Sequence, residues 1–222
     1  LPRPLRNDVS VQLLPGVHRI TQPFIVDPAA GGDESHNVKF YGTNATVSGG
    51  VPITDWTAVT HSNGITPRSS VLWRATLPTE FDATPIGNRM QAWRGQQRLT
   101  LASSPTRRYV HAEASNITFN GTDIRASYHD QSSVLLLLWE SWTASFHSLT
   151  RVDAVSHVAY LATHFNDQWA NSASGSRFAV CNALEELDRD NEFYIDATSG
   201  EMFLQLPNGD DPNVKSGSDA DA

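Results

Sequence analysis

Four carboxyl side chains stand in strand-like sequence, where they could take part in acid–base chemistry: Glu113, Asp123, Glu140 and Asp153. Glycosidic bonds are cleaved by two carboxyl groups, about 5 Å apart for retention or about 6.5–9.5 Å for inversion, one of them with a raised pKa. Glu140 is the strongest candidate because Trp139 and Trp142 flank it, and these rings could raise its pKa and stack on a sugar. The alternative is that Glu140 only ends a strand at the rim of the core. An active enzyme would use Glu140 with Glu113 or Asp153.

Four tryptophans could form a platform that stacks on glycan rings: Trp93, Trp139, Trp142 and Trp169. Large aromatic side chains are highly buried on average, so packing in the core is the alternative for each of them. The two interpretations differ in a simple observable, which is the exposure of each indole ring.

Other kinds of catalytic and binding site have little support in the sequence. The eight His residues include no pair spaced i, i+4, and neither a calcium-binding loop nor a Gly-x-Ser-x-Gly or phosphate-binding motif occurs. The acidic run Asp188–Glu192 is typical of a turn, although its oxygens could contact a hard cation. Cys181 is the only cysteine, which excludes an intramolecular disulfide, and its apolar neighbours indicate a buried structural thiol. The sequence therefore predicts no metal and no cofactor.

The charge of the chain bears on its partners and on its location. A net charge of −8 with only two Lys residues disfavours nucleic acids and anionic membranes. The longest apolar run, Ser133–Trp139, is much shorter than the roughly 20 residues of a membrane-spanning helix. The first ten residues lack the apolar core of a signal peptide, as in a mature chain. Three sequons, at Asn44, Asn116 and Asn120, lie in turn-like or strand-edge sequence. We therefore expect a secreted glycoprotein without a membrane-spanning segment.

Period-two alternation and β-branched residues dominate, which predicts an all-β protein. The first fifty residues predict short strands separated by turns: 9–14, 17–20, 24–26, 38–41 and 45–48. This spacing fits stacked coils of parallel strands, but an antiparallel meander gives the same local pattern.

Longer, Trp-bearing segments follow from Val51 onward. Gly95 in the Arg94-Gly95-Gln96 step predicts a tight hairpin. The strand at 133–139 should be central and covered on both sides, because its two faces are both apolar. The apolar spacing at 180–187 predicts one or two helical turns, and 191–206 predicts a hairpin. Residues 207–222 are too polar to pack and are expected to form a linker or tail. The expected divisions are 1–50, 51–206 and 207–222.

Several segments resemble the right-handed parallel β-helix proteins related to glycoside hydrolases. Early coils of that family are similar to "VQLLPGVHRITQPFIV" and "VKFYGTNATVSGG", and its insertion is similar to "VPITDWT", "LWRATLP" and "RMQAWRGQQRLTLASSP". The final hairpin matches in its Tyr194-Ile195-Asp196 step. The chain departs from the family at Asn191-Glu192-Phe193-Tyr194, where Gly-Glu-Trp-Tyr is expected, and at Leu101-Ala102-Ser103, where an Ala-Arg step is expected.

This resemblance implies a truncated right-handed parallel β-helix with a β-rich, sandwich-like insertion and little helix. In the family, the catalytic carboxylates lie on coils that follow the final hairpin. One expectation is therefore a non-catalytic extracellular glycoprotein that binds glycans or stacks head to tail with copies of itself. The other is the N-terminal portion of a polysaccharide-active glycoside hydrolase.

Overall fold

The computed structural model describes residues 4–59, 71–79, 81, 90–165 and 177–214. These residues divide into two compact units, Leu1–Pro52 and Ile53–Val214. No helix in the described ranges is long and apolar enough to cross a membrane. Within these described residues, the regular structure is all β apart from two single turns of 3-10 helix, which confirms the predicted class.

The first unit contains four strands: β1 (Val9–Gln12), β2 (Gly16–Arg19), β3 (Val38–Tyr41) and β4 (Ala45–Ser48). They form two parallel pairs, β1 with β3 and β2 with β4. Val9 pairs with Val38 and Gly16 with Ala45, so in both pairs the partner lies 29 positions further along the chain. Parallel strands require such a long connection, because a tight turn can join only antiparallel strands. A solenoid of several coils is not found in the described residues.

The strand predicted at 24–26 is wrong. Residues Phe24, Ile25 and Val26 have no regular structure and are exposed, so their apolar alternation is not matched by a neighbouring strand. The phenyl ring of Phe24 instead meets the ring of Phe40 edge to face, with 5.5 Å between the ring centroids. A strand needs a partner for its backbone groups, which a local sequence pattern cannot supply.

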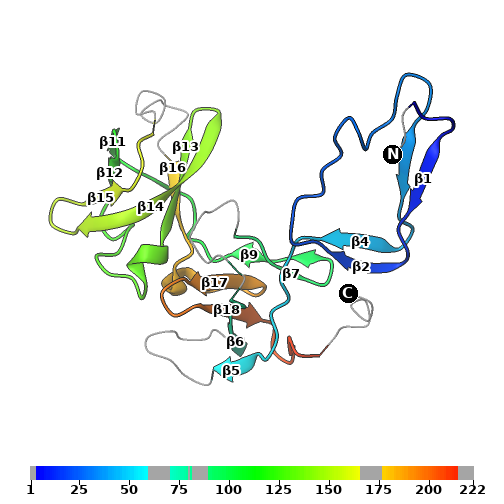
Figure 1. Ribbon diagram of the computed structural model, residues 1–222. Helices are drawn as coiled ribbons and strands as arrows, with labels where there is room; N and C mark the ends of the chain where they lie inside the picture. Colours follow the sequence, from blue (N-terminus) through cyan, green and yellow to red (C-terminus); the bar gives the residue numbers. More distant parts are fainter. Residues whose placement is uncertain (1–3, 60–70, 80, 82–89, 166–176, 215–222) are drawn as a thin grey trace. The chain divides into compact units, whose positions relative to one another are not determined.

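The second unit contains two larger sheets and a small hairpin (Figure 1). The seven-stranded sheet has the order β10-β16-β13-β14-β15-β12-β11. Its strands are β10 (Arg107–Arg108), β11 (His111–Glu113), β12 (Asn116–Thr118), β13 (Leu135–Glu140), β14 (Thr143–Asp153), β15 (Val158–Leu161) and β16 (Arg177–Cys181). All its pairings are antiparallel.

The five-stranded sheet has the order β5-β6-β18-β17-β9 and is mixed, because β17 and β9 run parallel. Its strands are β5 (Thr57–Val59), β6 (Val71–Thr76), β9 (Thr100–Leu101), β17 (Glu192–Asp196) and β18 (Glu201–Leu206). The separate hairpin joins β7 (Trp93–Arg94) to β8 (Gln97–Arg98). Gly95 has a φ of 57° in its turn, which confirms the predicted role of this glycine.

Strand β13 is an interior strand of the seven-stranded sheet, as predicted, with β16 on one side and β14 on the other. Its alternate residues enter two different cores. Leu136 and Leu138 pack in a hydrophobic core on one face of the sheet, which we call its first face, together with Phe178, Val180 and Ile117. Leu135 joins the core between the two sheets, which we call the inter-sheet core. The sequence of β13 is therefore apolar at both alternating sets of positions because both faces of the strand are buried.

The inter-sheet core places the two sheets of this unit face to face. It joins residues of the seven-stranded sheet to residues of the five-stranded one: Leu135, Ala179 and Cys181 with Phe193, Ile195, Met202 and Leu204. This arrangement is that of a sandwich. Burial raises the pKa of the Cys181 thiol to about 12, so at neutral pH Cys181 is a protonated core residue.

The helix predicted at 180–187 is largely wrong. Val180 and Cys181 belong to β16, which pairs with β13, and only Leu184–Glu186 forms a single 3-10 turn, η2. The helical spacing of the apolar residues arises because they enter different cores. Val180 and Ala183 pack on the first face of the seven-stranded sheet, whereas Leu184 packs with Tyr194 and Phe203. Pairing across the sheet overrides the local pattern.

Candidate functional site

Glu140 is the last residue of β13 and is buried, with 7% of its surface exposed. It lies on the same face of the strand as Leu136 and Leu138. Its Oε1 accepts a hydrogen bond from Ser145 Oγ at 2.8 Å, and its Oε2 accepts one from Thr143 Oγ1 at 3.4 Å. The carboxylate at the strand end is thus held by two hydroxyls of the adjacent strand β14.

A row of hydrogen bonds continues from Ser145 to the surface. His147 Nε2 lies 2.7 Å from Ser145 Oγ, and His147 Nδ1 lies 2.7 Å from Thr163 Oγ1. Since Ser145 has one proton and donates it to Glu140, the Nε2 of His147 must carry the proton that reaches Ser145. A neutral His147 then accepts at Nδ1 from Thr163. All three bonds point toward Glu140, an arrangement in which each bond strengthens the next.

This direction decides what the row can do chemically. Nucleophilic catalysis by Ser145 would require an unprotonated His147 Nε2 to receive the serine proton. With the tautomer assigned above, that nitrogen is the donor to Ser145, and the serine hydroxyl donates its proton in a hydrogen bond to Glu140. The row therefore satisfies a buried carboxylate and a buried imidazole, and it does not activate Ser145.

The stability of the fold should depend on His147 in mildly acidic solution. Burial lowers the pKa of His147 below its ordinary value of 6.5, against the opposing charge of Glu140. Below pH 6.5 the unfolded chain gains a proton that the folded chain resists, so the free energy of unfolding should fall as the pH drops through this window. Urea unfolding at pH 7.5 and pH 5.5 measures this loss.

His147→Gln is the variant that isolates this contribution. Glu192 has a pKa raised by burial, which acts in the opposite sense, and it is present in both proteins. The difference between wild type and His147→Gln should therefore shrink from pH 7.5 to pH 5.5. An unchanged difference would contradict the assigned role of His147.

The other predicted carboxylates are not placed near Glu140. Glu140 pairs with Thr143 at the start of β14, and Asp153 is its last residue. At about 3.3 Å of rise per residue, the two ends of β14 are roughly 30 Å apart. Glu113, on β11, is three strands from β14 and level with Arg151, which is about 14 Å across the sheet and far along β14 from Thr143, the partner of Glu140. Neither spacing is the one required of a catalytic pair.

The remaining candidate carboxylate, Asp123, also has a structural environment. It lies 3.7 Å from Arg107 Nε, and its main-chain carbonyl accepts a hydrogen bond from the same guanidinium. Asp153 caps its own turn by accepting hydrogen bonds from the main-chain N–H groups of Val155 and Ser156. These bonds, led by the one from Ser156, lower the pKa of Asp153 below 3.8.

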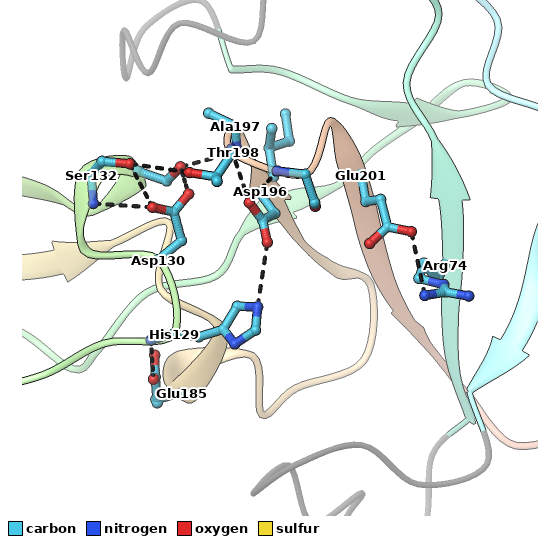
Figure 2. Close-up of polar contacts among 12 residues, drawn as sticks. Arg74, His129, Asp130, Ser132, Glu185, Asp196, Ala197, Thr198 and Glu201 are labelled. Atoms are coloured by element: carbon cyan, nitrogen blue, oxygen red, sulfur yellow. Dashed lines mark hydrogen bonds and ion pairs between the residues drawn. The ribbon is translucent and has the colours of Figure 1, made fainter.

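A second polar cluster surrounds Asp196, at the end of the Tyr194-Ile195-Asp196 step (Figure 2). Asp196 is 4% exposed, and its Oδ1 accepts hydrogen bonds from the N–H groups of Thr198 and Ser199 at 3.0 and 2.9 Å. Its Oδ2 lies 3.3 Å from His129 Nε2. The buried carboxylate thus both shapes the β17–β18 turn and holds an imidazole whose side chain is 46% exposed.

The loop before β13 provides the rest of this cluster. Asp130 accepts a hydrogen bond from Ser132 N at 3.1 Å and caps the 3-10 turn η1 (Gln131–Ser133). Burial opposes the ionisation of Asp130, but hydrogen bonds from Ser132 and Ser133 outweigh it and lower its pKa. Ser133 Oγ also accepts from Ala197 N at 3.0 Å. These contacts attach the β17–β18 turn to the segment that directly precedes β13.

Two polar atoms beside Asp196 have unmet hydrogen-bonding capacity. The hydroxyl of Tyr194 and Oε2 of Glu185 are both buried without a hydrogen-bond partner in the described structure. Burial raises the pKa of Tyr194, and the nearby carboxylates of Asp196, Asp130 and Glu185 add to this. The described residues contain no group of three or more His, Cys, Asp or Glu arranged to hold a metal ion. Through Asp196 the cluster orients the imidazole of His129, and an imidazole held in this way can transfer protons.

The tryptophans of the predicted platform differ in how far their side chains are exposed to solvent. Trp142 and Trp93 are exposed, at 74% and 53%. Trp139 is half-buried and packs against the inter-sheet core. Arg98 lies over the Trp93 ring at 5.9 Å, and Arg177 over the Trp139 ring at 5.6 Å. The prediction for Trp169 lies outside the described residues. Exposure thus leaves Trp93 and Trp142 able to contact a ligand.

The three sequons also differ in access. Asn44 and Asn120 are exposed in turns, and Asn44 has a φ of 57°. Asn116 is half-buried in β12, between β11 and β15. A glycan on Asn44 or Asn120 would extend from a turn, which is the ordinary surface position for this modification.

Comparison with known proteins gives a likeness at the level of fold. No protein-family model matches the chain, and no curated protein matches it in sequence. The chain is similar to a solved structure described as a glycoside hydrolase, with a TM-score of 0.64 and 16% sequence identity. The likeness covers 93% of this chain and 37% of that one, so this chain spans little more than a third of its length.

Proposed function

We propose that this chain is the N-terminal portion of a polysaccharide-active glycoside hydrolase with a parallel β-helix. Within that enzyme, this portion binds glycan. The observation that carries the proposal is the repeated pairing of the first unit, where both strand pairs are parallel with the same 29-residue offset. A constant offset is how successive coils of a β-helix stack. The sandwich that follows it fits the insertion expected from the sequence.

Two further observations support this proposal over an enzyme complete in itself. The similar glycoside hydrolase structure is matched over 37% of its own length, which leaves ample room for catalytic coils elsewhere in such a protein. Among the described residues, Glu140 has neither Glu113 nor Asp153 at a catalytic spacing. Secretion and glycosylation belong to the same proposal, supported by the exposed sequons at Asn44 and Asn120.

Self-assembly is a second candidate, favoured by the apolar side chains on the first unit. Phe40, Tyr41 and Val47 are 43%, 48% and 50% exposed on β3 and β4. The outer edges of these strands have no partner strand within the described ranges. Open edges with apolar side chains favour the addition of another strand, which a second copy of this chain could supply.

One experiment tests both candidates on the protein from its native source. Intact mass, reducing-sugar release from a panel of polysaccharides, and sedimentation velocity are measured on the same preparation, alongside recombinant residues 1–222. A longer native polypeptide that releases sugar, with binding but no release by residues 1–222, would support the glycosidase portion. A native chain near 24.4 kDa plus glycan, without sugar release, would overturn it, and large assemblies of that chain would support the second candidate.

A further inference from the structure

The tip of the β13–β14 hairpin carries an aromatic surface beside the guanidinium of Arg177. Along one face of β13, exposure rises toward the tip, from Leu135 at 1% to the half-buried Trp139. Trp142, in the turn that follows, is 74% exposed. Phe146 of β14 pairs with Leu137 and is 37% exposed. We call Trp139, Trp142, Phe146 and Arg177 the hairpin-tip surface.

The sheet register shows that three of these side chains, Trp139, Phe146 and Arg177, are neighbours on one face, and Trp142 lies in the turn beside them. Trp139 pairs with Ala144 on one side and with Arg177 on the other. Phe146 is two positions beyond Ala144 on the same face of β14, within reach of Trp139 as a diagonal neighbour. The small side chain of Ala144 leaves the Trp139 ring uncovered from that side. Exposed aromatic rings arranged in this way can stack on the apolar faces of sugar rings.

Arg177 gives the surface a charge. Its guanidinium lies over the Trp139 ring at 5.6 Å, which fixes the position of the charge beside the aromatic side chains. Within the described parts of the chain, no carboxylate forms an ion pair with Arg177, and its buried Nε–H has no hydrogen-bond partner. On a chain with a net charge of −8, an uncompensated guanidinium is a feature that a carboxylate ligand would complement.

We propose that the hairpin-tip surface binds an acidic polysaccharide, with Trp142 and Phe146 stacking on sugar rings and Arg177 pairing with a uronate carboxylate. This proposal rests on the proposed function and names the class of its glycan. Among the described residues no carboxylate pairs with this guanidinium, so a uronate would pair with its two terminal nitrogens, and bidentate pairing is a geometry that Arg favours for this group. Glu140 points to the opposite face of β13, so it does not compete for Arg177.

The test measures binding by residues 1–222 with affinity electrophoresis in gels that contain polygalacturonate, alginate, xylan or glucomannan. Retardation is expected in the two acidic gels. Trp142→Ala and Arg177→Gln should each weaken binding about tenfold, which corresponds to the loss of one charged or stacking contact. Val155→Ala is the control, because Val155 is 93% exposed in the turn at the opposite end of β14 and its truncation should leave binding unchanged.

Each outcome either supports or overturns binding of acidic polysaccharide at the hairpin-tip surface. Thermal melting checks that Arg177→Gln, whose side chain is half-buried, and Trp142→Ala, in the exposed turn, both remain folded. No retardation in an acidic gel, equal retardation in neutral and acidic gels, or full binding by Trp142→Ala would overturn the proposal. A native protein of short length that still binds polygalacturonate through Trp142 would support this surface while contradicting the proposed glycosidase portion.

Discussion

Replacing Asn182 by Ala is expected to lower the free energy of unfolding by about 3–4 kcal/mol. Asn182 is fully buried and follows β16 directly. Its amide nitrogen donates to the carbonyls of Ser133 and Ile195, both at 2.9 Å, and its amide oxygen accepts from Ile195 N at 2.9 Å. Ala would leave three buried main-chain groups without partners. Urea denaturation followed by far-UV circular dichroism measures the loss.

The expected loss of stability is large because the hydrogen bonds of Asn182 connect different parts of the fold. Asn182 ends a strand of the seven-stranded sheet, whereas Ile195 is in β17 of the five-stranded sheet, so one side chain joins the two sheets of the sandwich. Asn182 also has a φ of 52°, which Ala tolerates poorly. Asn191→Ala is the matched control, since Asn191 has a φ of 63° and is half-buried. A loss no greater than that of the control would refute the bridging role.

Replacing Ser145 by Ala is expected to cost about 2–3 kcal/mol, because its hydroxyl joins a buried carboxylate to a buried imidazole. The substitution removes a donor from Glu140 Oε1 and an acceptor from His147 Nε2 in a single step. Hydrogen bonds to charged groups are the stronger class, and the two groups that remain are both buried. Ser148→Ala, also on β14 but facing the other side of the strand, is the control and should change stability little.

A double-mutant cycle shows whether Ser145 and His147 act as one row. If they do, the cost of Ser145→Ala should be much smaller in a His147→Gln background, because the bond between them is already lost. The unfolding free energies of the wild type, both single variants and the double variant complete the cycle. Strictly additive costs would mean that the two side chains are stabilised independently.

The sequence predicted those elements whose partners are close or whose faces are unambiguous. The hairpin at 191–206 was predicted and corresponds to β17 and β18. The predicted strands at 38–41 and 45–48 coincide with β3 and β4. The interior position of β13 could be predicted because a strand with two apolar faces must be covered twice. In each case the signal lies within the segment itself.

The features that could not be predicted depend on contacts between distant segments. The apolar residues from Val180 to Leu187 match a helical period, yet they divide between two cores that only the pairing of β16 with β13 separates. Asp196 and His129 are far apart in sequence, and no spacing rule brings them together. Glu140 could be predicted as a strand-end carboxylate, but its hydroxyl partners required the register of β14.

The order of β6 and β18 in the five-stranded sheet has a consequence for synthesis of the chain. Thr76 pairs with Glu201, and every residue of the seven-stranded sheet lies between them in sequence. On the ribosome, the antiparallel neighbours β13, β14 and β15 can assemble as soon as they emerge, since their contacts are local. Strand β6 can pair on one side with β5, Val59 with Leu72, but its other edge must wait until β18 is made. The sandwich is therefore completed last by its final hairpin, and a nascent chain halted before β18 would expose a strand prone to aggregation.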